Sequence, residues 1–167
     1  MDVEKALLTR RSVRRFTSER VSGEDLEALL EAGRWAPSGL NNQPWRVVVI
    51  EGRGKAEELS ACTRYGSIVR SAPLLLAVFL DREASYDRDK DLMAVGAFIQ
   101  NILLAAHARG LGAVWLGEIL KEKRKVGELL DVPGECELAA VLAIGYPAEE
   151  PGSASRKPLH DIVLKRF

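Results

Sequence analysis

The segment Asp91–Arg109, DLMAVGAFIQNILLAAHAR, is the longest stretch of helical periodicity in this chain and indicates how the fold is built. Apolar residues recur along one face at intervals of three and four, and further apolar residues extend this face nearly all the way around. The first group is Leu92, Val95, Ile99, Ile102, Leu103 and Ala106, and the second is Met93, Ala97, Phe98, Leu104 and Ala105. A helix this apolar is expected at the centre of the molecule or in a subunit interface.

Four apolar segments around this helix predict strands, and amphipathic segments between them predict further helices. The strands are expected at Trp45–Ile50, which should be buried, and at Leu74–Leu80, Ala113–Leu116 and Leu138–Ile144; the helices are expected at Asp2–Thr9, from an N-cap at Ser22 to near Trp35, at Lys55–Thr63 and at Lys121–Leu130. We therefore expect one α+β domain over residues 1–167, with a mostly antiparallel sheet flanked by helices. The spacing alone also permits a doubly wound parallel sheet.

The composition indicates a globular protein without a global attraction to nucleic acid or anionic membranes, because its 24 basic and 24 acidic residues cancel. The longest strongly apolar run, Leu74–Leu80, is far shorter than the roughly 20 residues of a membrane-spanning helix. The N-terminal residues do not resemble a signal peptide, so we expect a cytoplasmic location. Three Asn and two Gln, beside abundant Arg and Glu, favour a thermophilic source.

Cysteine and histidine are too few and too scattered to predict a metal centre or a disulfide framework. Cys62 and Cys136 are the two cysteines, and we expect both in packing roles. His107 and His160 are the two histidines, and neither has a second ligand at metal-binding spacing. His107 falls inside the predicted central helix, where a structural role is expected.

The segment Arg10–Arg14 places three guanidinium groups and a hydroxyl within five residues. Arginine presents a planar fork that suits phosphate or carbonyl oxygens better than lysine does. A solvated surface of arginines is the simplest alternative. A nucleic-acid-binding patch is another, but the zero net charge and the lack of interleaved aromatic residues count against it. The segment is therefore a candidate anion site.

The segment Ala36–Trp45, APSGLNNQPW, crowds small, amide and aromatic residues around two prolines. Its Pro-Ser-Gly part alone predicts a turn, with Trp45 as a core anchor, but a turn does not require the adjacent carboxamides of Asn42 and Gln43. These amides can donate to and accept from the edge of a ring that carries carbonyl groups and ring nitrogens. Together with the arginine segment they predict a site for flavin mononucleotide (FMN).

Three other motifs fail on their spacing or context. Gly52–Lys55 resembles a phosphate-binding loop, but Val49 stands where its first glycine belongs. Gly110-Leu111-Gly112 lacks the third glycine of a dinucleotide-binding turn and precedes a strand instead of following one. Ser38 lacks the flanking glycines of a hydrolase nucleophile elbow.

With these segments in this order, the chain resembles the nitroreductase family of FMN-dependent flavoproteins over nearly its whole length. Arg10–Arg14 matches the opening motif of that family, and Pro37–Trp45 matches its second motif. The segment from Asp91 to Trp115 resembles the family's central helix and the following strand. The next residues, Leu116-Gly117-Glu118, fall where such proteins direct backbone amides at flavin N5. The family's closing segment resembles Gly145-Tyr146-Pro147 together with Arg156-Lys157-Pro158-Leu159.

The resemblance implies an obligate homodimer with two FMN sites at the subunit interface, each combining the arginine segment of one subunit with the Pro-Ser…Asn segment of the other. The implied cofactor-binding residues are Arg10, Arg11, Ser12, Arg14, Pro37, Ser38, Asn42, Gln43, Leu116, Gly117, Arg156 and Lys157. Arg10 or Arg11, with Ser12, Arg156 and Lys157, would meet the phosphate, and Arg14 would meet the N1 and C2 carbonyl side of the ring. No catalytic side chain and no metal are implied, because the flavin carries the chemistry.

The implied activity is that of an FMN-dependent oxidoreductase that takes hydride from NAD(P)H and passes electrons to a nitroaromatic, a quinone or a similar electron-poor acceptor by a ping-pong mechanism. The alternatives are a flavin-binding carrier or sensor without reductase turnover, and a specialised relative such as a reductive dehalogenase or an ene-type reductase. The segment between Asp81 and Asp91 is too short for the substantial helical lid of longer family members. An open acceptor site is therefore expected, which would suit a promiscuous enzyme or a protein partner.

Overall fold

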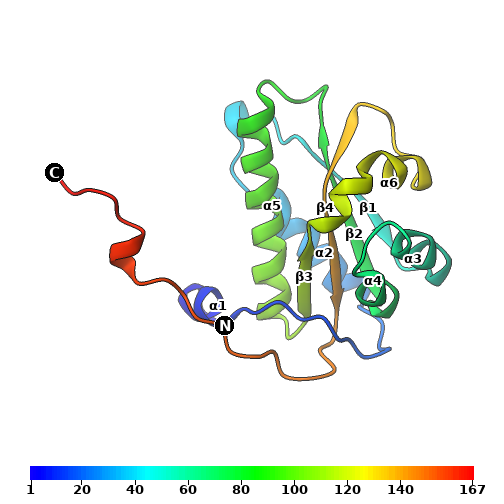
Figure 1. Ribbon diagram of the computed structural model, residues 1–167, viewed down its shortest axis with the longest axis horizontal. Helices are drawn as coiled ribbons and strands as arrows, with labels where there is room; N and C mark the ends of the chain where they lie inside the picture. The colour runs from blue at the N-terminus through cyan, green and yellow to red at the C-terminus, as the bar shows by residue number, and fades with distance from the viewer.

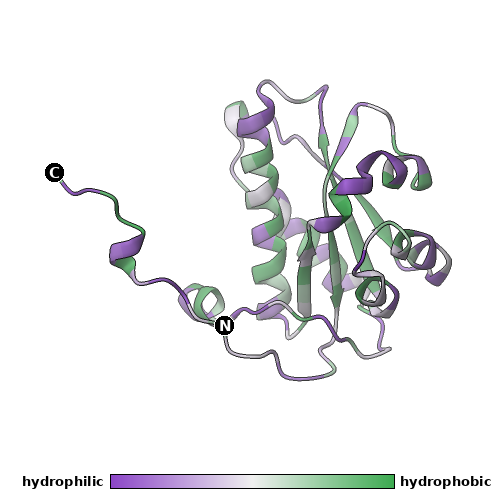
Figure 2. Ribbon diagram, in the orientation of Figure 1, coloured by the Kyte–Doolittle hydropathy of each residue, from purple (hydrophilic) through white to green (hydrophobic).

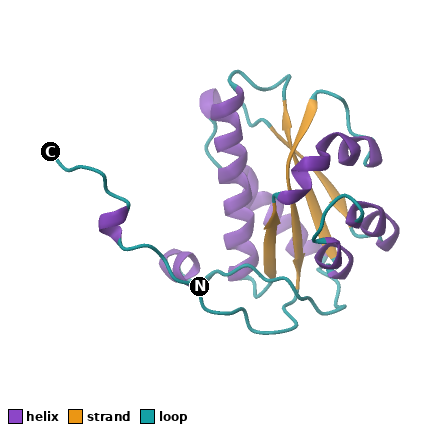
Figure 3. Cartoon of the chain, in the orientation of Figure 1, coloured by secondary structure: helices purple, strands orange, loops and turns teal.

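A four-stranded sheet forms the middle layer of the molecule, and the computed structural model describes residues 1–167 around it (Figure 1). The elements in chain order are α1 (Val3–Thr9), α2 (Gly23–Arg34), η1 (Gly39–Asn41), β1 (Trp45–Ile50), α3 (Arg53–Ser60), α4 (Gly66–Ser71), β2 (Leu74–Asp81), α5 (Arg88–Ala108), β3 (Gly112–Leu116), η2 (Glu118–Glu122), α6 (Lys123–Leu129), β4 (Cys136–Gly145) and η3 (Leu159–Asp161). Helices cover both faces of the sheet (Figure 3).

The strands follow the order β1-β2-β4-β3, and each neighbouring pair is antiparallel. The antiparallel prediction is therefore confirmed, and the doubly wound parallel alternative is wrong. The sequence could not distinguish an antiparallel sheet from a parallel one at β2. All eight residues of this strand are buried, so it forms an unbroken apolar run, which is the pattern typical of strands in parallel sheets. β1 is an edge strand with Arg46 and Val49 exposed, so the prediction that this strand is buried is wrong.

Alternation along β2 divides the core into two layers. Leu74, Leu76, Val78 and Leu80 belong to the layer with α2 and α5, whereas Leu75, Ala77 and Phe79 belong to the layer with α3, α4 and α6. The register between β2 and β4 shifts at Val78 and Phe79. Such a bulge changes which residues of β4 face each layer, and it places Leu138 in the same layer as Val141. Figure 2 shows the apolar strands between the two helical layers.

Helix boundaries follow local capping chemistry where the sequence carries it. Ser22 caps α2 as predicted, with its Oγ accepting from the amide of Asp25 at 3.0 Å. α5 begins at Arg88, earlier than predicted, because Asp87 caps it by accepting from the amide of Lys90 at 3.0 Å. The predicted Lys55–Thr63 helix is instead Arg53–Ser60, and α4 follows as a helix too short to show periodicity. The predicted Lys121–Leu130 helix is divided between η2 and α6.

α5 is the central helix of one layer. Ile99, Ile102 and Ala106 have no exposed surface, and Phe98 stacks on Trp45 with 5.1 Å between ring centroids. By length and composition α5 could also cross a membrane, but these residues pack in the core with α2 and the sheet. Its outer side is mostly apolar, with Met93 75% exposed and Gly96, Ala97 and Leu104 half-buried, and the half-buried Gln100 lies among them at helical spacing.

The C-terminal tail leaves the body after β4 and runs away from it (Figure 1). All residues from 151 to 167 are exposed, although several are large and apolar. Leu159 is 80% exposed and Leu164 is 95% exposed, and Ile162 and Phe167 also lack packing partners. A tail with such side chains has apolar surface that remains to be covered.

Candidate functional site

The arginine segment lies along the edge strand β3. Ser12 forms a parallel bridge with Ala113, and the amide of Val13 donates to the carbonyl of Ala113 at 3.1 Å. Val13 is buried, and Gly112 permits this approach, because a Cβ at that position would lie 2.6 Å from the Cβ of Val13. Since side chains alternate in an extended segment, the burial of Val13 directs Ser12 and Arg14 to the opposite side.

Positive charge gathers at the start of this segment. Burial, and then the charges of Arg156 and Arg11, lower the pKa of Arg10. Arg11 is held by the carbonyls of Leu8 and Arg10, each 2.8 Å from its Nη1. The side chains of Arg10 and Arg14 make no hydrogen bond or ion pair, so no acidic side chain neutralises them. Arg10, Arg11 and Arg156 therefore form a cationic cluster without an acidic partner, which makes it a candidate anion site.

His107 lies beside this cluster. Its Nε2 is 2.8 Å from Oγ1 of Thr9, whose hydroxyl donates to the carbonyl of Lys5. Burial, and then the charges of Arg10 and Arg11, lower the pKa of His107. The ring is therefore neutral at pH 7 and joins α1 to the C-terminal end of α5, which agrees with its expected structural role.

The Pro-Ser…Asn loop lies at the other end of α5, where η1 passes beside the helix (Figure 1). Leu40, Asn41 and Gln43 have positive φ values of 54°, 55° and 48°, a conformation that costs energy in residues other than glycine. Ser38 supports the loop by accepting from the amide of Gln43 at 3.0 Å. Such local strain, held by surrounding contacts, is typical of ligand-binding loops.

A buried carboxylate, Asp91, anchors this loop to α5. It accepts from Nδ2 of Asn42 at 2.9 Å, from the hydroxyl of Ser85 at 2.7 Å and from the amides of Tyr86 and Asp87 at 2.9 and 3.2 Å. Burial alone would raise the pKa of Asp91, but these hydrogen bonds outweigh it and lower the pKa. No local sequence signal predicts this role, because the partners of Asp91 lie in two separate loops.

Asn42 is only partly available to a ligand. Its Nδ2 is committed to Asp91 and to the carbonyl of Ala84 at 3.0 Å, and its buried Oδ1 has no hydrogen-bond partner. The neighbouring Gln43 is exposed and donates through Nε2 to the carbonyl of Asn41 at 3.3 Å, which leaves its Oε1 free. Of the two predicted carboxamides, Gln43 is therefore the one that faces outward.

Leu116 and Gly117 lie at the end of β3 away from the arginine segment. Leu116 is buried and Gly117 is exposed. The following residue, Glu118, secures the turn by accepting from the Thr63 hydroxyl at 2.8 Å and from the amide of Arg64 at 3.1 Å. These hydrogen bonds lower the pKa of Glu118 and keep it charged. Sequence reasoning missed this anchor, since Thr63 precedes it by more than fifty residues.

One chain does not bring the two predicted motifs together. The arginine cluster is beside His107 and the Asn42 loop is beside Asp91, so the full length of α5 separates them. At 1.5 Å per residue, these two positions on the helix are roughly 24 Å apart. Pro37 and Lys157 are exposed and make no side-chain hydrogen bond that could bridge this gap. The arginine cluster and the Asn42 loop therefore lie apart within one chain, and below we refer to them as the two half-sites of the expected flavin site.

Comparison with known proteins adds independent evidence. The family model described as "Nitroreductase family" matches residues 7–64 and 53–146. A Methanothermobacter thermautotrophicus protein, provisionally described as an NADH dehydrogenase/NAD(P)H nitroreductase, is 36% identical over 155 residues, which cover 92% of this chain and 81% of that protein. An iodotyrosine deiodinase from Thermotoga neapolitana is 30% identical over 181 residues, covering 93% of this chain and 92% of that enzyme.

A solved structure is similar over the whole chain. It is a crystal structure from Desulfovibrio desulfuricans, provisionally described as a nitroreductase, in complex with FMN. It superposes with a TM-score of 0.95 at 48% sequence identity, and the match covers 100% of this chain and 98% of that chain.

Proposed function

Because this chain belongs to the nitroreductase family, we propose that it is an FMN-dependent oxidoreductase that uses NAD(P)H as its electron donor. The observation that carries this proposal is the pair of half-sites at opposite ends of α5. The FMN complex of the Desulfovibrio desulfuricans relative supports the choice of cofactor.

We propose that two copies of the chain complete each site. If two α5 helices pack antiparallel across a two-fold axis, the Asn42 loop of one copy meets the arginine segment of the other. The outer side of α5 suits this contact, because Gly96 and Ala97 allow close approach and Met93 is exposed. Trp115, 42% exposed on the neighbouring β3, extends the same apolar surface.

The residues present fit FMN at both of its ends. Arg10, Arg11 and Arg156 form a cationic cluster without an acidic partner, which suits a phosphate of nearly two negative charges. Ser12 and Lys157 are the further proposed phosphate ligands, and Pro37, Ser38 and Gln43 lie in the loop proposed to meet the ring. The exposed Gly117, at the anchored turn after β3, leaves its backbone accessible to the flavin.

When bound, FMN supplies the redox chemistry, accepting hydride at N5 from NAD(P)H and passing electrons to an electron-poor acceptor. The chain's own residues bind and orient. Arg14, unpaired and exposed on the outward side of the arginine segment, is placed to stabilise negative charge near N1 and the C2 carbonyl. Glu118 holds the Leu116–Gly117 turn in position through Thr63 and Arg64.

Substrate access follows from the short connection after β2. The chain passes from Asp81 to the start of α5 at Arg88 without a helix between them, so this connection forms no helical lid. We propose an open acceptor site and a ping-pong exchange in which donor and acceptor occupy the same place in turn. A nitroaromatic or a quinone is the proposed acceptor class, and a cytoplasmic location remains our expectation.

Reductive dehalogenation is the second candidate, because the Thermotoga neapolitana relative named iodotyrosine deiodinase matches nearly the full length of both chains. In this chain that activity would take place at the same proposed flavin site, with a halogenated phenol as the acceptor. A carrier or sensor without turnover is a third interpretation, which no observation favours.

An anaerobic reduction experiment tests the proposal. The purified yellow protein is mixed with NADH or NADPH, and the flavin absorbance is followed as it bleaches. The bleached protein is then mixed with a quinone, a nitroaromatic or a halogenated phenol, and the acceptor that restores the colour fastest identifies the substrate class. Retained colour with both nucleotides would contradict the reductase assignment, and a protein that stays colourless with excess FMN would contradict the flavin site.

Arg14→Ala is the matching variant. Removing a charge-assisted contact to the reduced ring is expected to weaken FMN binding or slow flavin reduction about tenfold or more. Arg15→Ala is the control, since Arg15 is a neighbouring arginine that instead pairs with Glu149 at 3.4 Å. Equal FMN affinity and equal bleaching rates in the two variants would remove Arg14 from the site.

A further inference from the structure

A second cavity lies on the opposite side of the sheet from α5. It has a volume of about 550 Å³ and lies between the segment after the arginine motif, the start of α3 and the end of α4. Phe16, Ile50 and Ala72 line it with apolar surface and belong to the core layer of α3, α4 and α6. None of the residues proposed for the flavin site contributes to its lining.

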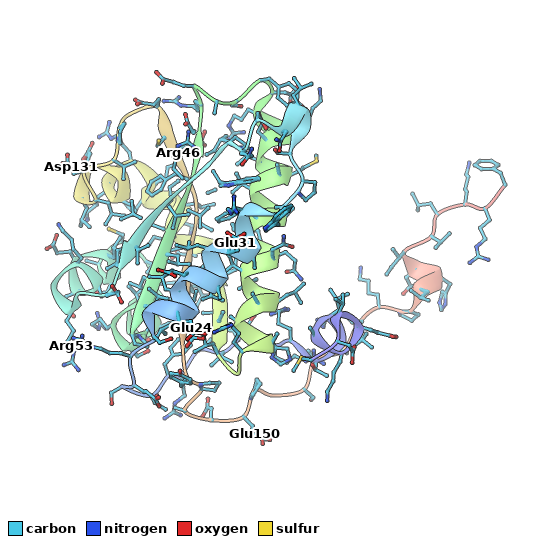
Figure 4. All side chains as sticks on the ribbon, turned by 180° about the vertical axis from the view of Figure 1, so that it is seen from behind. Glu24, Glu31, Arg46, Arg53, Asp131 and Glu150 are labelled. Atoms are coloured by element: carbon cyan, nitrogen blue, oxygen red, sulfur yellow. The ribbon has the colours of Figure 1, made fainter.

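Three arginines from three different segments line this cavity: Arg20 before α2, Arg53 at the start of α3 and Arg70 near the end of α4. Figure 4 labels Arg53, the first residue of α3, at the outer edge of the molecule. Arg70 is held in place, with Nη1 donating to Oγ of Ser60 at 2.8 Å and lying 3.7 Å from a carboxylate oxygen of Glu57. Glu51 is the one acidic residue of the lining. The cavity therefore carries an excess of positive charge.

Most arginine side chains in this chain have a partner within the protein, so the location of the unpaired ones can be compared with the candidate anion sites. The side chains of eleven of the sixteen arginines form an ion pair or donate a hydrogen bond within the protein, and the side chains of five do neither: Arg10, Arg14, Arg20, Arg53 and Arg166. Arg10 and Arg14 belong to the proposed flavin site, and Arg166 lies in the exposed tail. The remaining two, Arg20 and Arg53, line the same cavity.

We propose that this cavity is a second ligand site, which binds a small molecule carrying a phosphate or diphosphate group. Guanidinium forks from Arg20 and Arg53 pair with phosphate oxygens, and Arg70 adds charge from the far wall. The hydroxyl of Ser18, which makes no hydrogen bond in the protein, supplies a further donor at the rim. The volume lies in the usual range for small-molecule sites, and the apolar lining accommodates the organic part of the ligand.

Calorimetric titration of the FMN-loaded protein tests this site, because the flavin phosphate then occupies the other cationic cluster. The probes are pyrophosphate, AMP, inorganic phosphate and adenosine. We expect saturable binding of pyrophosphate and AMP in the submillimolar range and none of adenosine. Inorganic phosphate binding as tightly as AMP would support the site with free phosphate as its ligand.

Variants assign the binding to the cavity. Arg20→Ala and Arg53→Ala are each expected to weaken pyrophosphate binding at least tenfold, a loss of about 1.4 kcal/mol. Glu51→Gln is expected to tighten binding, since it removes the one opposing charge. Arg124→Ala is the control, because Arg124 is an exposed arginine on α6 that pairs with Glu128 outside this cavity.

Three results would overturn the proposal, the third of which moves the ligand to the flavin site. One is the absence of saturable pyrophosphate binding up to about 10 mM, a concentration beyond the weakest affinity that a specific site of this kind would show. Another is an equal loss of pyrophosphate binding in Arg124→Ala and in the two cavity variants, which would show that the protein's net charge, and not the cavity, determines the binding. Binding that disappears in Arg10→Ala and persists in Arg53→Ala would assign the phosphate to the flavin site instead.

Discussion

Asp91 has no exposed surface, yet the hydrogen bonds around it keep its carboxylate charged. Its partners come from the Asn42 loop and from the connection before α5, so one side chain joins two loops that the sequence separates widely. A buried charge with complete hydrogen bonding is costly to disturb, because any change leaves donors without an acceptor.

We predict that Asp91→Asn destabilises the protein by about 2–4 kcal/mol, because the amide replaces an acceptor with a donor that faces other donors. Urea unfolding of the two proteins measures the difference. Asp89→Asn is the control on the same turn of α5, since Asp89 has an 85% exposed side chain and contacts only Arg88, at 3.7 Å. If Asp91→Asn and Asp89→Asn unfold at the same urea concentration, Asp91 does not anchor the loop.

At the scale of elements, Glu137 joins three of them. It lies on β4 and accepts from Arg88 of α5 at 2.9 Å and from Lys123 at the start of α6 at 2.7 Å. Hydrogen bonds from Arg88, and then from Lys123, lower the pKa of Glu137 to about 2. Since its folded pKa lies below its unfolded value, Glu137 stabilises the fold above about pH 4.5 and loses that contribution as pH falls toward 2.

We therefore predict that Glu137→Gln lowers the free energy of unfolding by about 1–2 kcal/mol at pH 7 and changes it little near pH 2. Urea midpoints measured across this pH range give the difference. Glu128→Gln is the control, because Glu128 has a 68% exposed side chain and pairs with a 93% exposed Arg124. A gap between wild type and Glu137→Gln that is constant with pH would show that the charge of Glu137 is not the cause.

At the scale of the whole molecule, a single chain leaves its site and its surface incomplete. The two motifs lie at opposite ends of α5, the outer side of α5 is mostly apolar, and the tail carries large apolar side chains that are exposed. A symmetric dimer would address all three features, because it pairs the motifs of different copies and gives the tail a partner surface.

We predict that Met93→Lys shifts the protein from dimer to monomer and removes bound FMN, since it would place a charged side chain in the apolar contact proposed between the two α5 helices. Light scattering after size-exclusion chromatography gives the mass, and absorbance gives the flavin content. Glu128→Lys, on α6 in the opposite layer, controls for added positive charge. A wild-type protein that is monomeric and yellow would contradict the shared site.

Local signals predicted much of the fold and the nature of the site. Ser22 caps α2 where the sequence indicates, Pro37 follows the end of that helix, and the apolar stretch from Asp91 forms most of α5. The arginine segment and the Pro-Ser…Asn segment were recognisable because their chemistry resides in neighbouring residues. These features depend on contacts between residues a few positions apart, which the order of side chains along the chain determines.

The tertiary structure alone decided the rest. In the folded chain, β1 is an exposed edge strand and α4 is a separate helix. Nδ2 of Asn42 donates to Asp91, and the Thr63 hydroxyl donates to Glu118 next to the Leu116–Gly117 turn. Tertiary packing also brings Arg20, Arg53 and Arg70 to the lining of one cavity. It also separated the two motifs by the length of α5. Each of these depends on which distant segments pack together, and no local pattern of residues contains that information, because long-range packing is a property of the whole folded chain.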